Sequence, residues 1–149
     1  MAAGPSAAES RDVLELLGGR KTLGQPLRTA ADYVDLVRRG LPYGAFRSVA
    51  AQLTLSFQDV QDTLQLSPRT LHRRKAQRLS PVESERVMRL ARVAARARHV
   101  LGDLDAALDW LTSPNRALGG ERPLRLLDTD LGAEQVQELL GRIEHGVYS

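Results

Sequence analysis

The stretch from residue 80 to 101 constrains the fold most strongly, because it predicts one long helix. It opens with the residues SPVE, the pattern of a capping box with proline at the first helical position. Apolar residues then recur at helical spacing on one face: Val87, Leu90, Ala91, Ala94, Ala97 and Leu101. The opposite face carries arginines at positions 86, 89, 92 and 96. This basic face either extends a contact with phosphate or is simply the solvated side of the helix.

The rest of the sequence also indicates helices that are joined by short breaks. Aromatic residues make up only 4% of the chain, and a composition rich in Leu, Ala and Arg favours helices over sheets. Shorter helices are predicted at residues 13–17, 30–39, 46–53, 57–64, 67–75, 103–112 and 133–145. We expect residues 1–10 to be disordered and residues 123–130 to be extended or looping, and we predict no strand. The fold class is therefore predicted to be all-α.

Residues 57–75, FQDVQDTLQLSPRTLHRRK, have the arrangement of a helix-turn-helix. The first helix is expected to place Phe57, Val60 and Leu64 in the core. Gln65 occupies the turn, where many such motifs have glycine because a residue there needs a positive φ. The candidate DNA-binding residues lie at the start and on the exposed sides of the second helix: Ser67, Arg69, Thr70, His72, Arg73, Arg74 and Lys75. The alternative is a solvated basic helix that serves only the fold.

The charged residues are unevenly distributed along the chain. Residues 41–99 carry 11 basic and 4 acidic side chains, whereas residues 100–149 carry 4 basic and 9 acidic ones. A basic middle beside an acidic end suggests two different partners. The alternative is that both regions are merely solvated surfaces.

Several function classes find no support in the sequence. The chain has no cysteine, and His72, His99 and His145 lack the spacing of metal ligands. It contains no phosphate-binding loop and no nucleophile elbow, so we expect neither an enzyme nor a cofactor or metal site. It also lacks a secretory signal and an apolar run approaching the roughly 20 residues that cross a bilayer. We therefore expect a cytoplasmic protein that does not bind membranes.

From about residue 41 to 149 the sequence resembles antitoxins of the Xre/MbcA/ParS type. The resemblance rests on ordered pieces at matching spacing: RTLHRRK at 69–75, LSPVES at 79–84, WL at 110–111, PN at 114–115, PL at 123–124, LDT at 127–129, Gly132 and EHGVY at 144–148. It implies a RES-domain toxin as partner, a protein that resembles ADP-ribosyltransferases and consumes NAD⁺ or uses it to modify a target. It also implies that the C-terminal domain binds the toxin and its tail occludes the NAD site. The Xre-like domain is implied to dimerise and often to bind the promoter of its own operon.

The residues at the C-terminal end fit inhibition by obstruction. Gly146 is expected to end the last helix, so that the following three residues leave as a short tail with an amphipathic ring and a terminal carboxylate. Nearby acidic groups would steer this end toward a basic nucleotide pocket. The candidate toxin-binding residues are Asp128, Glu144, Gly146, Val147, Tyr148 and Ser149. The alternative is that Gly146 is only a helix cap and the tail packs back on its own domain.

We thus expect a helix-turn-helix N-terminal domain followed by a small helical toxin-binding domain. Residues 1–28 would form a flexible segment with a short helix, residues 29–100 the helix-turn-helix and dimerisation domain, and residues 101–149 the toxin-binding domain. The predicted function is an antitoxin that neutralises a RES-type toxin and represses its own operon by binding operator DNA, as a homodimer within a larger complex. The alternative is a stand-alone helix-turn-helix transcriptional regulator.

Overall fold

The structure, a computed structural model, describes residues 4–146, and this part of the chain contains helices but no strand. The helices of the first half are α1 (Ala7–Leu16), α2 (Gly19–Leu23), α3 (Ala30–Arg39), α4 (Tyr43–Gln52), α5 (Phe57–Asp59), the π-helix η1 (Val60–Leu64) and α6 (Pro68–Arg74). They are followed by α7 (Pro81–Leu101), α8 (Leu104–Thr112), two 3₁₀-helices, η2 (Arg116–Leu118) and η3 (Pro123–Asp128), and α9 (Asp130–Glu144). The predicted all-α fold is confirmed.

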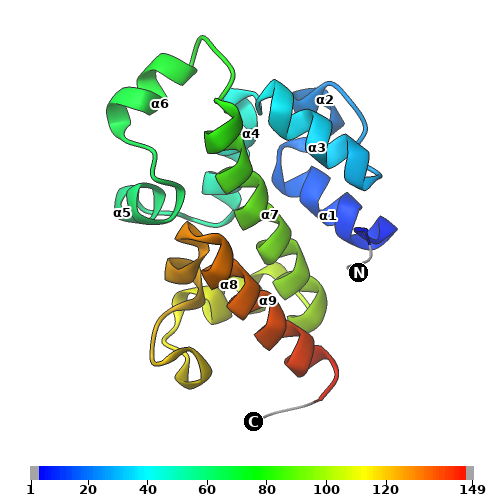
Figure 1. Ribbon diagram of the computed structural model, residues 1–149, viewed down its shortest axis with the longest axis vertical. Coiled ribbons are helices and arrows are strands. Elements are labelled where there is room, and N and C mark those ends of the chain that lie inside the picture. The colour runs from blue at the N-terminus through cyan, green and yellow to red at the C-terminus, as the bar shows by residue number, and fades with distance from the viewer. Residues whose placement is uncertain (1–3, 147–149) are drawn as a thin grey trace.

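Helix α7 forms the centre of the molecule (Figure 1). It packs against α1, α3 and α4 of the first half and against α8 and α9 of the second. Because neighbours cover it from several sides, its buried residues extend beyond the predicted stripe and include Met88, Val93 and Ala95. The predicted capping box is present, with Ser80 Oγ accepting from the Glu83 amide at 3.2 Å. One continuous core therefore joins both halves of the chain.

Two expectations about the N-terminal region are wrong. Residues 1–10 were expected to be disordered, but α1 begins at Ala7, where the side chain of Ser6 caps it. Helix α2, flanked by glycines, lies in a region expected to be a loop. Val13, Leu16 and Leu17 are fully buried, and burying this apolar face stabilises the N-terminal helix against the core.

Two expectations in the later segments are also wrong. Residues 123–128 form η3 rather than an extended loop, because Leu124 and Leu127, three residues apart, both turn into the core. Phe57 was expected to lie inward but is 85% exposed. Phe57 stands at the first position of the three-residue helix α5, whereas Val60, Thr63 and Leu64 of the π-helix that follows are the residues buried in the core.

Candidate binding surfaces

Helix α6, the second helix of the helix-turn-helix, is held at its start by local hydrogen bonds. Gln65 has φ 55° and ψ 41°, so the turn adopts the left-handed conformation that its position predicted. Ser67 then caps α6 by accepting from the Thr70 amide at 3.2 Å. The helix contains no buried residue and touches the core through Leu71, and Figure 1 shows it at the outer edge of the molecule. Most of its polar side chains are therefore exposed at the surface.

The structure brings most of the predicted DNA-binding residues to this outer surface. Five of them are exposed: Ser67, Arg69, His72, Arg73 and Lys75. Thr70 is half-buried, and its hydroxyl oxygen accepts a hydrogen bond from Ser67 Oγ at 3.1 Å. The exposed cations have the chemistry to bind phosphates and guanine edges.

Arg74 differs from the other candidates because its guanidinium is bound within the molecule. Its Nε and Nη2 atoms donate to the two carboxylate oxygens of Glu83 at 2.8 and 3.2 Å, and Nη1 donates to Gln77 Oε1 at 3.1 Å. The hydrogen bond to Glu83 raises the pKa of Arg74. Burial pushes the pKa of Glu83 up, but the hydrogen bonds from Arg74 and from the Ser80 amide outweigh it and hold the pKa below its ordinary value. Arg74 therefore orients α6 rather than extending toward a ligand.

Three of the four arginines on the predicted basic face of α7 bind within the molecule. Arg89 pairs with Asp130 of α9, Arg92 lies 3.7 Å from Glu9 of α1, and Arg96 donates to Glu144 of α9 at 2.9 Å. The face is thus neither a simple solvated side nor a free phosphate-binding surface. Its ion pairs link α7 to helices from both ends of the chain.

The end of α9 is anchored to α7 just before the last described residues. Glu144 accepts from Arg96, and its other carboxylate oxygen lies 3.6 Å from His99 Nε2. Gly146 follows with φ 72°, a conformation that ends the helix, as expected from the sequence. Asp128 is half-buried at the end of η3. The candidates Val147, Tyr148 and Ser149 lie outside the described residues.

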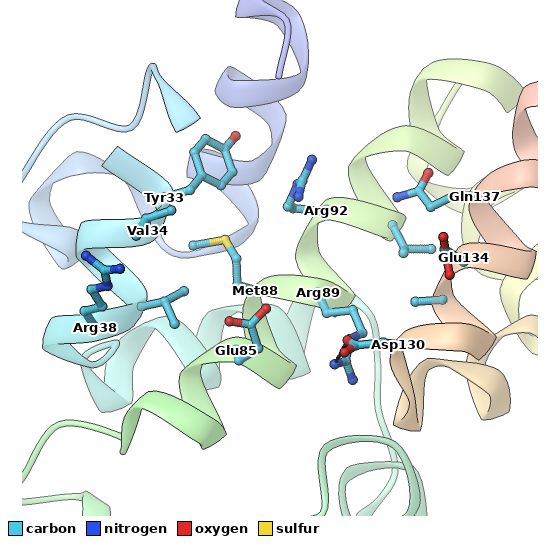
Figure 2. A pocket seen from close by; sticks show the side chains of 13 residues that line it. Tyr33, Val34, Arg38, Glu85, Met88, Arg89, Arg92, Asp130, Glu134 and Gln137 are labelled. Carbon is cyan, nitrogen blue, oxygen red and sulfur yellow. Dashed lines mark hydrogen bonds and ion pairs between the residues drawn. The ribbon is translucent and has the colours of Figure 1, made fainter. Parts of the chain in front are cut away.

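A groove of about 480 Å³ runs between α3, α7 and α9. Figure 2 shows Met88 near its middle, with Val34 and Arg38 on the α3 side and Glu134 and Gln137 on the α9 side. The guanidinium of Arg92 lies 5.6 Å from the centre of the Tyr33 ring, a cation–π contact at one edge of the groove. The groove thus separates the N-terminal helices from α9 and is bridged by α7.

Comparison with known proteins decides the family. A sequence profile described as "Antitoxin Xre-like helix-turn-helix domain" matches residues 32–92, and one described as "Antitoxin Xre/MbcA/ParS C-terminal toxin-binding domain" matches residues 96–146. An "Antitoxin Xre" of Yersinia enterocolitica is 32% identical over 132 residues, which cover 87% of this chain and 89% of that protein. The chain belongs to the Xre/MbcA/ParS antitoxin family. The resemblance stated from the sequence is confirmed.

One further relative and one solved structure are similar to this antitoxin. The "Prs ADP-ribosylating antitoxin" of a Sphingobium species is 30% identical over 129 residues, covering 79% of this chain and 81% of that protein. A chain in the crystal structure of the M. tuberculosis MbcT-MbcA toxin-antitoxin complex superposes with a TM-score of 0.52 and 27% sequence identity. That likeness covers 80% of the antitoxin and 96% of the other chain.

The matched toxin-binding domain corresponds to the end of α7 together with α8, η2, η3 and α9. The two family matches adjoin each other inside α7, and the domain limits expected at residues 28 and 100 stay predictions.

None of the helices described is long and apolar enough to cross a membrane. Within residues 4–146 no group of three or more His, Cys, Asp or Glu side chains could hold a metal ion.

The partners that fix α6 and the end of α9 could not be predicted from the sequence. Glu83 was recognised as a capping residue but not as the partner of Arg74, and the contact of Arg96 with Glu144 was not foreseen. These two pairs are 9 and 48 residues apart. No spacing rule for a single helix relates residues so far apart, so the only available signal was the basic face of the predicted helix at residues 80–101 beside an acidic C-terminal region.

Proposed function

We propose that this antitoxin neutralises a RES-type, NAD-consuming toxin by covering the toxin's NAD site with the end of α9 and the residues that follow it. We further propose that it acts as a homodimer within a larger toxin–antitoxin complex and represses its own operon through α6. The match to the toxin-binding family supports neutralisation of a toxin, because it favours an antitoxin over a stand-alone regulator. The exposed cations of α6 support the second.

The anchored end of α9 is the observation that supports obstruction most directly. Arg96 holds Glu144 against α7, so Gly146 at the end of α9 has a fixed position. A fixed starting point lowers the entropy cost of placing a short tail in a partner's pocket. Glu134 and Glu138 are exposed on the same helix and add negative charge. Nucleotide pockets bind phosphates with cations and backbone donors, so an acidic surface complements them.

The names of two relatives agree with this choice of toxin. One relative is called an ADP-ribosylating antitoxin, and ADP-ribosylation is a reaction in which NAD⁺ is the usual donor. A chain of similar structure was crystallised in a toxin–antitoxin complex. These names describe other proteins, and they support an NAD-dependent enzyme as the class of partner to test first.

Deletion of Val147–Ser149 tests the obstruction. We expect the truncated antitoxin to keep its helical content and thermal unfolding profile, but to inhibit NAD⁺ consumption by a co-expressed RES-domain toxin at least tenfold less well, because the occluding segment is gone. The matched control removes Met1–Ala3, an equally short segment at the other end. Full inhibition by the truncated protein contradicts the obstruction.

Substitution of Arg69 and Arg73 by alanine tests the DNA-binding surface. We expect the double variant to bind a duplex from the region upstream of its own gene more weakly. The slope of the logarithm of the binding constant against the logarithm of the salt concentration should become shallower by roughly 1 to 2, because up to two phosphate contacts are lost. Arg142→Ala, at an exposed position of α9, is the matched control. If the double variant retards the duplex in a gel as strongly as the wild type does, α6 is not the DNA-binding helix. Arg74 is left intact because its loss would disturb the orientation of α6.

A further inference from the structure

A hollow in the N-terminal region is a feature that the proposed function does not use. Its volume is about 440 Å³, and it lies between α1, the start of α2 and the segment that leads into α3. Small-molecule sites have volumes of roughly 300–1,000 Å³. The residues that line this N-terminal hollow fall between positions 7 and 28, outside both family matches, the first of which begins at residue 32. Figure 1 shows α1 and α2 on one side of the central helix α7 and α6 on the other.

Three arginines line the N-terminal hollow, one from each of the segments that form it. Arg11 lies on α1, Arg20 on α2 and Arg28 before α3, and all three are exposed. Among the described residues that line the hollow none is acidic. Within residues 4–146, none of the three guanidinium groups has an ion pair or a hydrogen bond to another side chain. Asp32 Oδ2 accepts from the backbone amide of Arg28 at 2.9 Å, and not from its guanidinium. The hollow therefore presents three positive charges without a bound counter-charge.

The acidic residues of α1 do not offset these charges, because they lie on another face of the helix. Asp12 and Glu15 lie 3.8 and 3.6 Å from the guanidinium of Arg98 on α7. Glu9 lies 3.7 Å from the guanidinium of Arg92 on the same helix. Helix α1 thus directs its carboxylates toward α7 and its arginine toward the hollow.

The rest of the lining is apolar, apart from one buried hydroxyl. The apolar part consists of Ala7, Leu14, Pro26 and Leu27. Ser10 also lines the hollow and is only 4% exposed, with its Oγ accepting from the Tyr33 hydroxyl at 3.1 Å. That bond leaves the hydroxyl proton of Ser10 available to a ligand. A ligand that fits this lining has an apolar or aromatic part beside a negatively charged group that accepts hydrogen bonds.

We propose that the N-terminal hollow binds an organic phosphate with the chemistry of a nucleoside diphosphate. Arginine binds phosphate oxygens in pairs, and three arginines match two or more negative charges, which a single carboxylate does not supply. The leucine and proline side chains contact the ring system of the ligand, as apolar residues do in most small-molecule sites. A protein partner usually covers about 20–30 residues, whereas eight line this hollow.

Titration of the full-length antitoxin with ADP, followed by calorimetry in a phosphate-free buffer, tests the proposal. We expect saturable binding of one ADP per chain. Arg11→Ala and Arg20→Ala should each weaken it at least about tenfold, because each removes a charge-assisted hydrogen bond to a phosphate oxygen. Arg116→Ala, at an exposed position of η2, is the matched control and should bind ADP like the wild type.

Two further variants test the apolar part of the site. Ala7→Trp fills the hollow without removing a charge, and it should abolish ADP binding. Ala7 is exposed at the first position of α1, so circular dichroism should show an unaltered fold. Leu14→Ala should weaken ADP binding at least about threefold and leave pyrophosphate binding unchanged, because pyrophosphate has the charges but no ring.

The exposed cations of α6 are the rival site for a phosphate, so the Arg69→Ala, Arg73→Ala double variant is titrated in parallel. It should bind ADP like the wild type. Loss of binding in this variant, with binding retained by Arg11→Ala and Arg20→Ala, would place the phosphate on α6 and overturn the proposal.

Two other results would also overturn it. One is the absence of saturable ADP binding to the wild type in the millimolar range, and the other is equal affinity for pyrophosphate and ADP. Neither bears on neutralisation of the toxin or on operator binding, because the titration contains only the antitoxin and the phosphate compound.

Discussion

The carboxylate of Glu83 belongs to two hydrogen-bond networks in two neighbouring helices. It accepts from the Ser80 amide at 2.8 Å to cap α7, and it accepts both hydrogen bonds from Arg74 at the end of α6. Its side chain is only 13% exposed, so solvent screens these contacts little. One residue thus fixes where the central helix begins and how the proposed DNA-binding helix is oriented.

Glu83→Gln should therefore destabilise the antitoxin by about 1–2 kcal/mol, because the amide keeps the shape but weakens both networks. Chemical denaturation measures the change, and amide exchange should speed up in α6 in particular. Glu138→Gln, at an exposed position of α9, is the matched control and should have no measurable effect. An equal effect of the two substitutions would show that the carboxylate contributes only surface charge.

The same contact predicts a dependence on pH. The folded-state pKa of Glu83 lies below its ordinary value of 4.5, so its stabilising contribution is complete above pH 4.5 and is lost as the pH falls through the folded-state pKa. The difference in unfolding free energy between wild type and Glu83→Gln should accordingly shrink in that acidic range. A difference that stays constant from pH 7 to pH 3 would show that the ionised carboxylate of Glu83 is not the source of this stability.

At the scale of elements, the seam between η3 and α9 depends on one glycine. A Cβ atom at Gly132 would collide with the carbonyl oxygen of Leu126, so the two helices approach as closely as they do only because that position lacks a side chain. The hydroxyl of Thr63, fully buried in η1, donates to the Leu124 carbonyl at 3.3 Å on the other side of η3. Helix η3 is thus packed between the helix-turn-helix and the last helix.

Gly132→Ala should cost about 2 kcal/mol or more of stability, because the added methyl forces backbone apart at a packed seam. Gly141→Ala in the same helix is the matched control, since its Cβ would meet the Arg96 guanidinium at an ordinary 3.7 Å. The control should be neutral or stabilise by up to about 1 kcal/mol through helix propensity. Thermal unfolding of the two variants side by side checks both values, and equal melting temperatures would argue against the close approach.

Helices with a cap and a clear apolar period could be predicted from the sequence, and the others could not. Helix α7 starts and ends where its capping box and apolar stripe indicate, and α3 spans Ala30–Arg39 and is stopped by Gly40 as expected. Helix α2 is five residues long, and η3 has the three-residue period of a 3₁₀-helix, so neither gives an amphipathic α-helical pattern. The π-helix η1 also gives no distinct signal, because local apolar spacing does not distinguish it from an α-helix.

At the scale of the whole molecule, α7 serves both halves of the antitoxin. Its buried residues pack on α1 and α3 as well as on α8 and α9, and the matches to the helix-turn-helix and toxin-binding families meet within it. The family and the outer position of α6 could be anticipated from motif order and charge. The pairing of Arg96 with Glu144 could not, because it depends on how α9 returns along α7. The proposed toxin contact and DNA contact are therefore linked through one rigid helix.

The kinetics of NAD⁺ consumption by the proposed partner, a RES-domain toxin that copurifies with this antitoxin, test the central claim most directly. Initial rates should be measured over a range of NAD⁺ concentrations at several fixed concentrations of the full-length antitoxin. With the antitoxin in excess over the toxin, and toxin, antitoxin and NAD⁺ brought to equilibrium before each rate is read, an antitoxin that covers the NAD site raises the apparent KM for NAD⁺ and leaves kcat unchanged. A lowered kcat with an unaltered KM, or rates that do not respond to the antitoxin at all, would contradict the account.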